Sequence, residues 1–178
     1  MMLKLRENLP VIIEHHPLHE SLNVKIIEDA RDFGYGGVSN VRPPETSSYS
    51  IISSPSIELI YNWMLILLES ENKGWSFEVQ NSWFVHYVKD QSALSHHHHP
   101  ADFSFVYFIR CPKGSSPLVF TTSGKKIKAE EGKVAIFPGN LSHHVPKNKS
   151  DGRMVLAGNI WTTSMTQTAE TNPRNNFK

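Results

Sequence analysis

The chain has 178 residues and carries 18 Lys and Arg against 17 Asp and Glu, which gives a formal net charge of +1. This balance leaves no basic excess for phosphate backbones, so we expect no nucleic-acid partner. A hydrophobic content of 39% with 20% charged residues predicts a folded domain rather than a disordered chain. The single cysteine, Cys111, excludes an intramolecular disulfide framework and a Cys-rich zinc site.

Residues 1–74 predict a helical and loop-rich support. A short apolar piece, Leu9–Ile13, precedes a helix expected within 17–33, and a second helix is expected to begin at a capping Ser56 and to end before Asn72. Between them, residues 34–55 are rich in proline, serine and glycine, which predicts a long connection. The sequence leaves open whether this connection is a lid.

The most apolar stretch, Ile57–Leu68, is too short for a membrane span, which needs about 20 apolar residues. The first ten residues contain no apolar core of a targeting signal. We therefore expect a cytoplasmic protein that makes no membrane contact.

From Trp75 onward the sequence consists of short aromatic and β-branched segments separated by turn residues. This rhythm is typical of an antiparallel sandwich or jelly roll. We predict a single domain over 1–178 that is mainly β, with a jelly-roll core at 75–162, the N-terminal helices packed on it and a polar tail at 163–178. The expected strands are WSFEV, SWFVHYV, FSFVYFI, PLVFTT, KVAIFP and RMVLAGNIW.

Four consecutive histidines, His96–His99, precede Pro100. In a strand, alternate residues share a face, so His97 and His99 would point to one side, and His96 and His98 to the other. Two imidazoles aimed into a barrel provide half of a metal site. The alternative is a solvated polar loop that binds metal without a function.

Two later residues strengthen the metal interpretation. His143 follows the turn after the predicted strand 133–138, where a jelly roll would bring it near the histidine run. Arg153 comes ten residues later, at the start of an apolar strand. A buried arginine needs a partner, and a bound carboxylate would supply two parallel hydrogen bonds. The simpler alternatives are a surface histidine and an arginine at an exposed strand end.

Residues 75–161 resemble the Fe(II)/2-oxoglutarate-dependent oxygenases related to prolyl hydroxylases, which have the double-stranded β-helix, or cupin-like, fold. The resemblance rests on the motifs His97-x-His99-Pro100, Gly132…Phe137-Pro138, Leu141-x-His143-x-Val145-Pro146-x-Asn148, Arg153 and Gly158-Asn159. It implies an oxygenase that uses Fe(II), O2 and 2-oxoglutarate as co-substrate to hydroxylate a small molecule or a peptide.

The resemblance also implies the metal ligands. His97 and His143 would be two of them, and the third would be His99 by strand register or Asp102 by chemistry, because a carboxylate usually completes such a triad. The wider superfamily has His-x-Asp/Glu where this chain has His97-x-His99. No catalytic side chain is expected beyond the ligands.

For the co-substrate, the resemblance assigns Arg153 to the distal carboxylate of 2-oxoglutarate. Val155 stands where the family often has a serine, so Tyr107 or Asn159 would complete the binding of 2-oxoglutarate. Two alternatives remain: a metal cupin, dioxygenase or isomerase, that does not use 2-oxoglutarate, and a non-enzymatic ligand-binding jelly roll. The prime substrate and the oligomeric state stay open.

Overall fold

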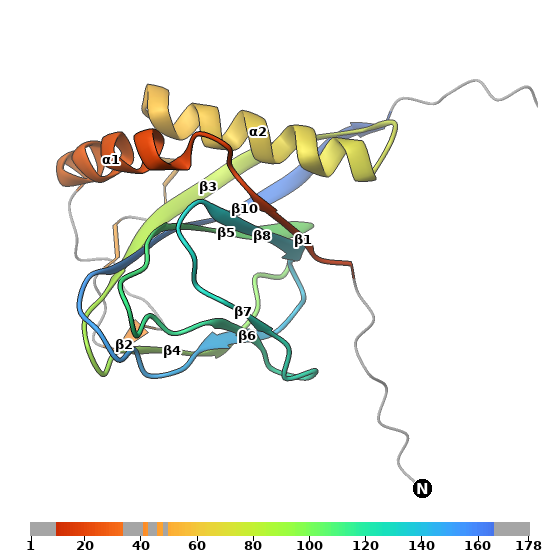
Figure 1. The fold of residues 1–178 in the computed structure, drawn as a ribbon. Helices are drawn as coiled ribbons and strands as arrows, with labels where there is room; N and C mark the ends of the chain where they lie inside the picture. Colours follow the sequence, from red (N-terminus) through yellow and green to blue (C-terminus); the bar gives the residue numbers. More distant parts are fainter. Residues whose placement is uncertain (1–9, 34–40, 43–45, 48–49, 166–178) are drawn as a thin grey trace, which may run out of the picture.

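Two five-stranded antiparallel sheets face each other in the computed structural model, which describes residues 10–33, 41–42, 46–47 and 50–165 (Figure 1). The larger sheet has the order β1 (Ile12–His15), β8 (Lys133–Pro138), β5 (Phe103–Arg110), β10 (Arg153–Met165), β3 (Trp75–Tyr87). The smaller sheet has the order β2 (Val41–Arg42), β4 (Ser92–His96), β9 (His143–Val145), β6 (Leu118–Phe120), β7 (Lys126–Ile127). The predicted mainly-β jelly roll is confirmed.

The helices α1 (His19–Asp29) and α2 (Pro55–Glu71), with the short 3-10 helix η1 (Ala30–Asp32), cover the outer face of the larger sheet (Figure 1). The cap of α2 is Ser54 rather than Ser56, because Pro55 occupies the first helical turn and the Ser54 hydroxyl accepts a hydrogen bond from Ile57 N. None of the helices in the described ranges is long and apolar enough to cross a membrane.

Strand alternation divides the core between the two faces of the larger sheet. On β5, Phe105, Tyr107 and Ile109 join the cluster beneath the helices, whereas Val106 and Phe108 point toward the smaller sheet. The helical side is filled by large apolar side chains. The space between the two sheets holds a second cluster of aromatic and aliphatic side chains and contains the cavity described below.

Some predicted boundaries differ in the structure. The apolar piece before the first helix forms β1, which pairs with β8 and so belongs to the larger sheet. The segments 75–79 and 82–88 form one long strand, β3, and β10 continues to Met165, past the predicted end of the core. Much of 34–55, the segment that could form a lid, and most of the predicted tail lie outside the described residues.

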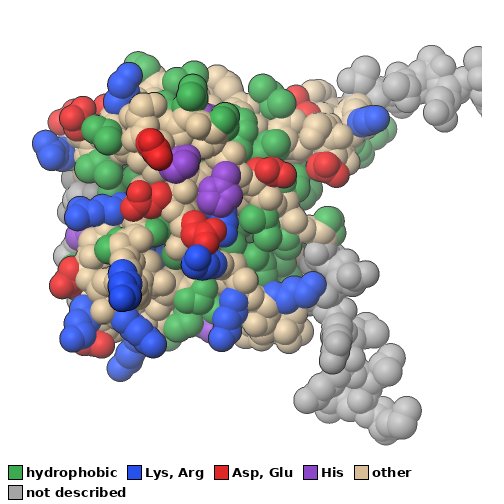
Figure 2. All heavy atoms as spheres, viewed as in Figure 1, with side chains coloured by type: hydrophobic (Ala, Val, Ile, Leu, Met, Phe, Trp, Pro, Cys, Tyr) green, Lys and Arg blue, Asp and Glu red, His purple; other side chains and the backbone are tan. Residues whose placement is uncertain are grey.

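The charged surface is uneven. Exposed lysines flank β7, and on the face drawn in Figure 2 basic side chains gather over the smaller sheet. Acidic side chains lie mostly over the larger sheet and the helical layer in this view. No described segment carries a continuous run of one charge, in keeping with the near-neutral composition.

Candidate functional site

A cavity of about 300 Å³ lies between the two sheets. Its walls are aromatic and small aliphatic side chains, and its polar groups are four histidines, Arg153 and Asn159. No Asp or Glu from the described ranges lines it. The lining residues are Trp83, Val85, Tyr87, Ala93, His96, His97, His98, Phe105, Val106, Leu118, Phe137, His143, Val145, Arg153, Val155, Ala157 and Asn159.

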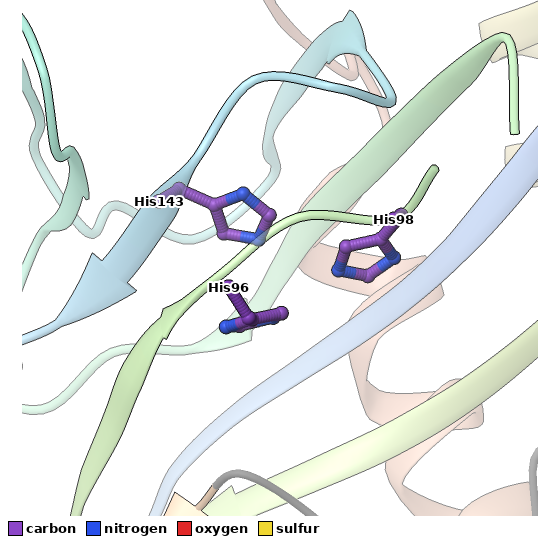
Figure 3. A group of neighbouring side chains, drawn as sticks. All are labelled: His96, His98 and His143. Atoms are coloured by element: carbon purple, nitrogen blue, oxygen red, sulfur yellow. The ribbon is translucent and has the colours of Figure 1, made fainter. Parts of the chain in front are cut away.

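Three of the histidines form a cluster that could hold a metal ion. One ring nitrogen each from His96, His98 and His143 lies within 4.8 Å of the other two. Figure 3 shows His96 and His98 on one segment and His143 on the neighbouring strand, with the three rings converging. Three imidazole ligands leave coordination positions open, as a catalytic metal site requires.

A β-bulge explains why His96 and His98 point inward. Ala93 pairs with Val145 and His96 pairs with His143, so three steps along β4 match two along β9. Alternation counted from the buried Ala93 would have placed His97 on the inner face. The extra residue shifts the register by one and turns His96 inward instead.

The metal ligands predicted from the sequence therefore divide into two groups. His143 lies in the cluster, whereas His97 and His99 are exposed and do not. His97 lies at the margin of the cavity and its Nδ1 accepts a hydrogen bond from His99 N at 3.2 Å. The prediction placed His97 and His99 on the inner face, whereas in the structure His96 and His98 lie with His143 in the cluster. No local sequence signal marks the bulge that decides this. Which of these histidines bind the metal stays a prediction.

Each clustered ring has its Nδ1 beside a hydrogen-bond acceptor. His96 Nδ1 donates to Leu94 O at 2.7 Å and His143 Nδ1 to Leu141 O at 2.9 Å. His98 Nδ1 donates to Asn159 Oδ1 at 2.7 Å. With the proton on Nδ1, the Nε2 lone pair is left for a ligand, which is the usual arrangement of metal-binding histidines. His98 Nε2 is buried and has no hydrogen-bond partner in the described chain.

Burial keeps these rings neutral. Desolvation is the main cause that lowers the pKa of His143 to about 3 and that of His98 to about 4, and it also lowers the pKa of His96. The neighbouring histidines lower these pKa values further, because a second positive charge nearby would be repelled. A neutral imidazole is the form that binds a metal ion.

Arg153 is buried in the same cavity, with 1% of its surface exposed. Its Nε donates to Ser116 O at 3.1 Å, and its guanidinium lies 4.4 Å from the centre of the Tyr87 ring. Its Nη1 is buried without a hydrogen-bond partner among the described residues. Such an orphan is costly, and a carboxylate from a bound ligand would satisfy it through paired hydrogen bonds.

The remaining predicted site residues have different positions. Tyr107 faces the helices, where its hydroxyl donates to Asn23 Oδ1 at 2.8 Å, so it does not line the cavity. Asn159 does line the cavity and contacts His98. Asp102 is exposed, and its Oδ2 accepts a hydrogen bond from Thr162 N at 2.8 Å. Asp102 is therefore held outside the histidine cluster.

Comparison by sequence found no matching family model and no matching curated protein. Comparison by structure found a viral collagen prolyl hydroxylase from Paramecium bursaria Chlorella virus-1, solved as its 2-oxoglutarate complex. The two share 14% identity over 84% of this chain and 94% of that chain, with a TM-score of 0.66.

Two bacterial structures are similar in the same way. A 2OG-Fe(II) oxygenase family oxidoreductase from Burkholderia pseudomallei has a TM-score of 0.68 and 12% identity, over 88% of this chain and 86% of that chain. HygX from Streptomyces hygroscopicus, with nickel and 2-oxoglutarate bound, has a TM-score of 0.66 and 10% identity, over 89% and 85%. At these identities the likeness shows the fold, and the function has to be argued from the site.

Proposed function

We propose that the protein is an Fe(II)- and 2-oxoglutarate-dependent dioxygenase that hydroxylates a small molecule or a peptide. The observation that carries the proposal is the pairing of two features in one cavity: three neutral imidazoles that converge, and a buried arginine with an unpartnered Nη1. Solved structures of the same fold hold 2-oxoglutarate, and in one case nickel as well. We propose the cytoplasm as its location, where a lone thiol such as Cys111 is ordinary.

The donor set fits a divalent transition metal. His96, His98 and His143 would hold iron through Nε2, and the acceptors at their Nδ1 atoms fix the ring orientations. Bound iron would supply O2 activation, coupling the decarboxylation of 2-oxoglutarate to succinate and CO2 with insertion of one oxygen atom into a substrate C–H bond.

The other cavity residues would bind and orient. The Arg153 fork would pair with the distal carboxylate of 2-oxoglutarate, and Ser116 O with the Tyr87 ring holds the guanidinium in place. The apolar walls, among them Val106, Val155 and Ala157, would exclude water from the reacting centre.

Arg153→Lys tests the proposal. Loss of the planar fork should weaken 2-oxoglutarate binding about ten- to a hundredfold, the equivalent of about 1.5–3 kcal/mol, while leaving metal binding intact. The measurement is an anaerobic titration of the Fe(II)-loaded protein with 2-oxoglutarate, followed by the metal-to-ligand charge-transfer absorbance. Arg110→Lys, at an exposed arginine of β5, is the matched control. A wild type that holds iron but gives no such absorbance at saturating 2-oxoglutarate would contradict the assignment.

A second candidate function is favoured by the composition of the cluster. Three histidines without a carboxylate also suit a metal cupin that works without 2-oxoglutarate. In that case Arg153 would bind an anionic substrate directly, and the iron-loaded protein would not consume 2-oxoglutarate under oxygen. Succinate formation in the presence of iron and O2 separates the two candidates.

A further inference from the structure

We propose that His98 is a neutral third metal ligand in the place where a carboxylate completes the usual triad, and that the metal and the anionic co-substrate therefore depend strongly on each other for binding. This inference rests on the function proposed above and concerns how that function is adapted in this chain. The standard iron triad of this chemistry has two histidines and one carboxylate. The described part of this chain offers three imidazoles.

No carboxylate of the described chain is placed to join the cluster. Among the residues that the structure describes, no Asp or Glu lines the cavity. The nearest acid in sequence, Asp102, accepts a hydrogen bond from Thr162 N at 2.8 Å and is exposed to solvent. The Asp102 side chain would have to lose this hydrogen bond before its carboxylate oxygens could reach the cavity.

The surroundings of His98 are suited to an imidazole and not to a carboxylate. Asn159 Oδ1 accepts from His98 Nδ1 at 2.7 Å and from the Ser104 hydroxyl at 2.9 Å, while Asn159 Nδ2 donates to Asn81 Oδ1 at 2.9 Å. The network therefore presents an acceptor to residue 98, and a carboxylate there would face another oxygen. Trp83 stacks on the His98 ring, with centroids 5.6 Å apart and planes 13° apart. Asn159 is thus a positioning residue for His98.

The charge of the site follows from this composition. A divalent metal and Arg153 bring three positive charges, and the described residues supply no negative charge to the cavity lining. In a triad of two histidines and one carboxylate, the carboxylate of the protein neutralises one of these three positive charges. Here both carboxylates of 2-oxoglutarate meet an uncompensated field in a cavity of low dielectric, where charge interactions are strong. Because coupling is reciprocal, the metal in turn should gain affinity from 2-oxoglutarate.

The experiment measures this coupling by calorimetry. The affinity for Ni(II) is determined under anaerobic conditions, with and without saturating 2-oxoglutarate. The titration is carried out for the wild type and for His98→Asp. We expect 2-oxoglutarate to raise the Ni(II) affinity of the wild type by roughly tenfold more than that of His98→Asp. His99→Asp adds the same charge at an exposed neighbour outside the cluster, and its coupling should match that of the wild type.

A second variant guards against misfolding of His98→Asp. Asn159→Asp keeps the His98 ligand and its acceptor but adds a negative charge 2.7 Å from His98 Nδ1, so it should lower the coupling in the same direction and by less. Equal coupling in the wild type and in the folded variants would overturn the inference while leaving the proposed function intact. A wild type that binds no Ni(II) at all would overturn the proposed function itself.

Discussion

Adjacent residues of β5 and β10 send their side chains to opposite faces of the larger sheet, and the two faces differ in how their polar groups are satisfied. On the helical face, the Tyr107 hydroxyl donates to Asn23 Oδ1, and Asn23 Nδ2 donates to Ile109 O. On the cavity side, Arg153 Nη1 of β10 and His98 Nε2, from the segment that follows β4 of the smaller sheet, are buried with no partner in the described chain. The unpartnered groups at the cavity indicate where a ligand binds, whereas the polar groups named on the helical face are satisfied within the protein core.

The largest expected effect concerns the histidine cluster that lines the cavity. His143→Ala removes one of three converging ligands and should weaken Ni(II) binding by about a hundredfold or more. His99→Ala, at the exposed neighbour, should leave the stoichiometric Ni(II) affinity unchanged. Calorimetric titration of both variants with Ni(II) measures the affinity and the stoichiometry. Equal loss in both would mean that the histidine run binds metal without a defined site.

The sequence predicts much of this arrangement, and the exceptions have a physical cause. The alternating aromatic and β-branched segments predict the jelly roll. The position of Arg153 at the start of an apolar strand is compatible with a buried cation or with an exposed strand end, and the structure shows the buried one. Which histidines face inward depends on a bulge between Ala93 and His96, and this is set by pairing with β9, far along the chain. A pattern of four identical residues carries no information about a register fixed elsewhere.

Tyr107 shows the same limit. The sequence places it on an apolar strand in the middle of the core, where either face is compatible with a tyrosine. Its partner Asn23 lies on α1, more than eighty positions away, and the helix packs on the face that the hydroxyl reaches. Only the arrangement of helix and sheet assigns Tyr107 to the helical face.

Two neighbouring residues of β10 test the difference between the two faces of the larger sheet. Leu156 is fully buried beneath the helices, and Leu156→Ala should lower the free energy of unfolding by about 2–5 kcal/mol without changing ligand affinity. Ala157 lines the cavity, and Ala157→Leu fills space that the ligand would use. Ala157→Leu should lower the free energy of unfolding by less than Leu156→Ala does, and it should abolish 2-oxoglutarate binding. Urea unfolding together with 2-oxoglutarate titration tests both variants, and a reversed pattern would contradict the division.

Tyr107→Phe gives a smaller effect on the helical face. The change leaves Asn23 Oδ1 buried without its donor and should cost about 1–3 kcal/mol of stability. Because Tyr107 does not line the cavity, 2-oxoglutarate affinity should stay at the wild-type value. The measurement pairs denaturant unfolding with the anaerobic titration. A marked loss of 2-oxoglutarate affinity with unchanged stability would instead restore Tyr107 to the co-substrate site.

The smallest effect is expected at Glu130, which belongs to neither face. This carboxylate precedes β8 and forms ion pairs with Lys128, at 2.5 Å, and with Lys133, and it lies 3.6 Å from the ring of His15 on β1. Hydrogen bonds from the two lysines lower the pKa of Glu130 to about 2. Since the folded pKa lies below the unfolded one, the pairs stabilise the fold above the ordinary glutamate range, and this contribution is lost as the pH falls toward 2.

Glu130→Gln should therefore lower the melting temperature slightly at neutral pH. Lys128 is exposed, while Glu130 and Lys133 are half-buried at the edge of the sheet, and ion pairs this close to the surface contribute little. The difference between wild type and variant should shrink as the pH falls below about 4 and should shrink at high salt, because screening weakens exposed pairs. Thermal unfolding followed by circular dichroism across pH measures it. A loss as large as that of Leu156→Ala, unaffected by salt, would show that this edge of the sheet contributes to stability as much as the buried helical face does.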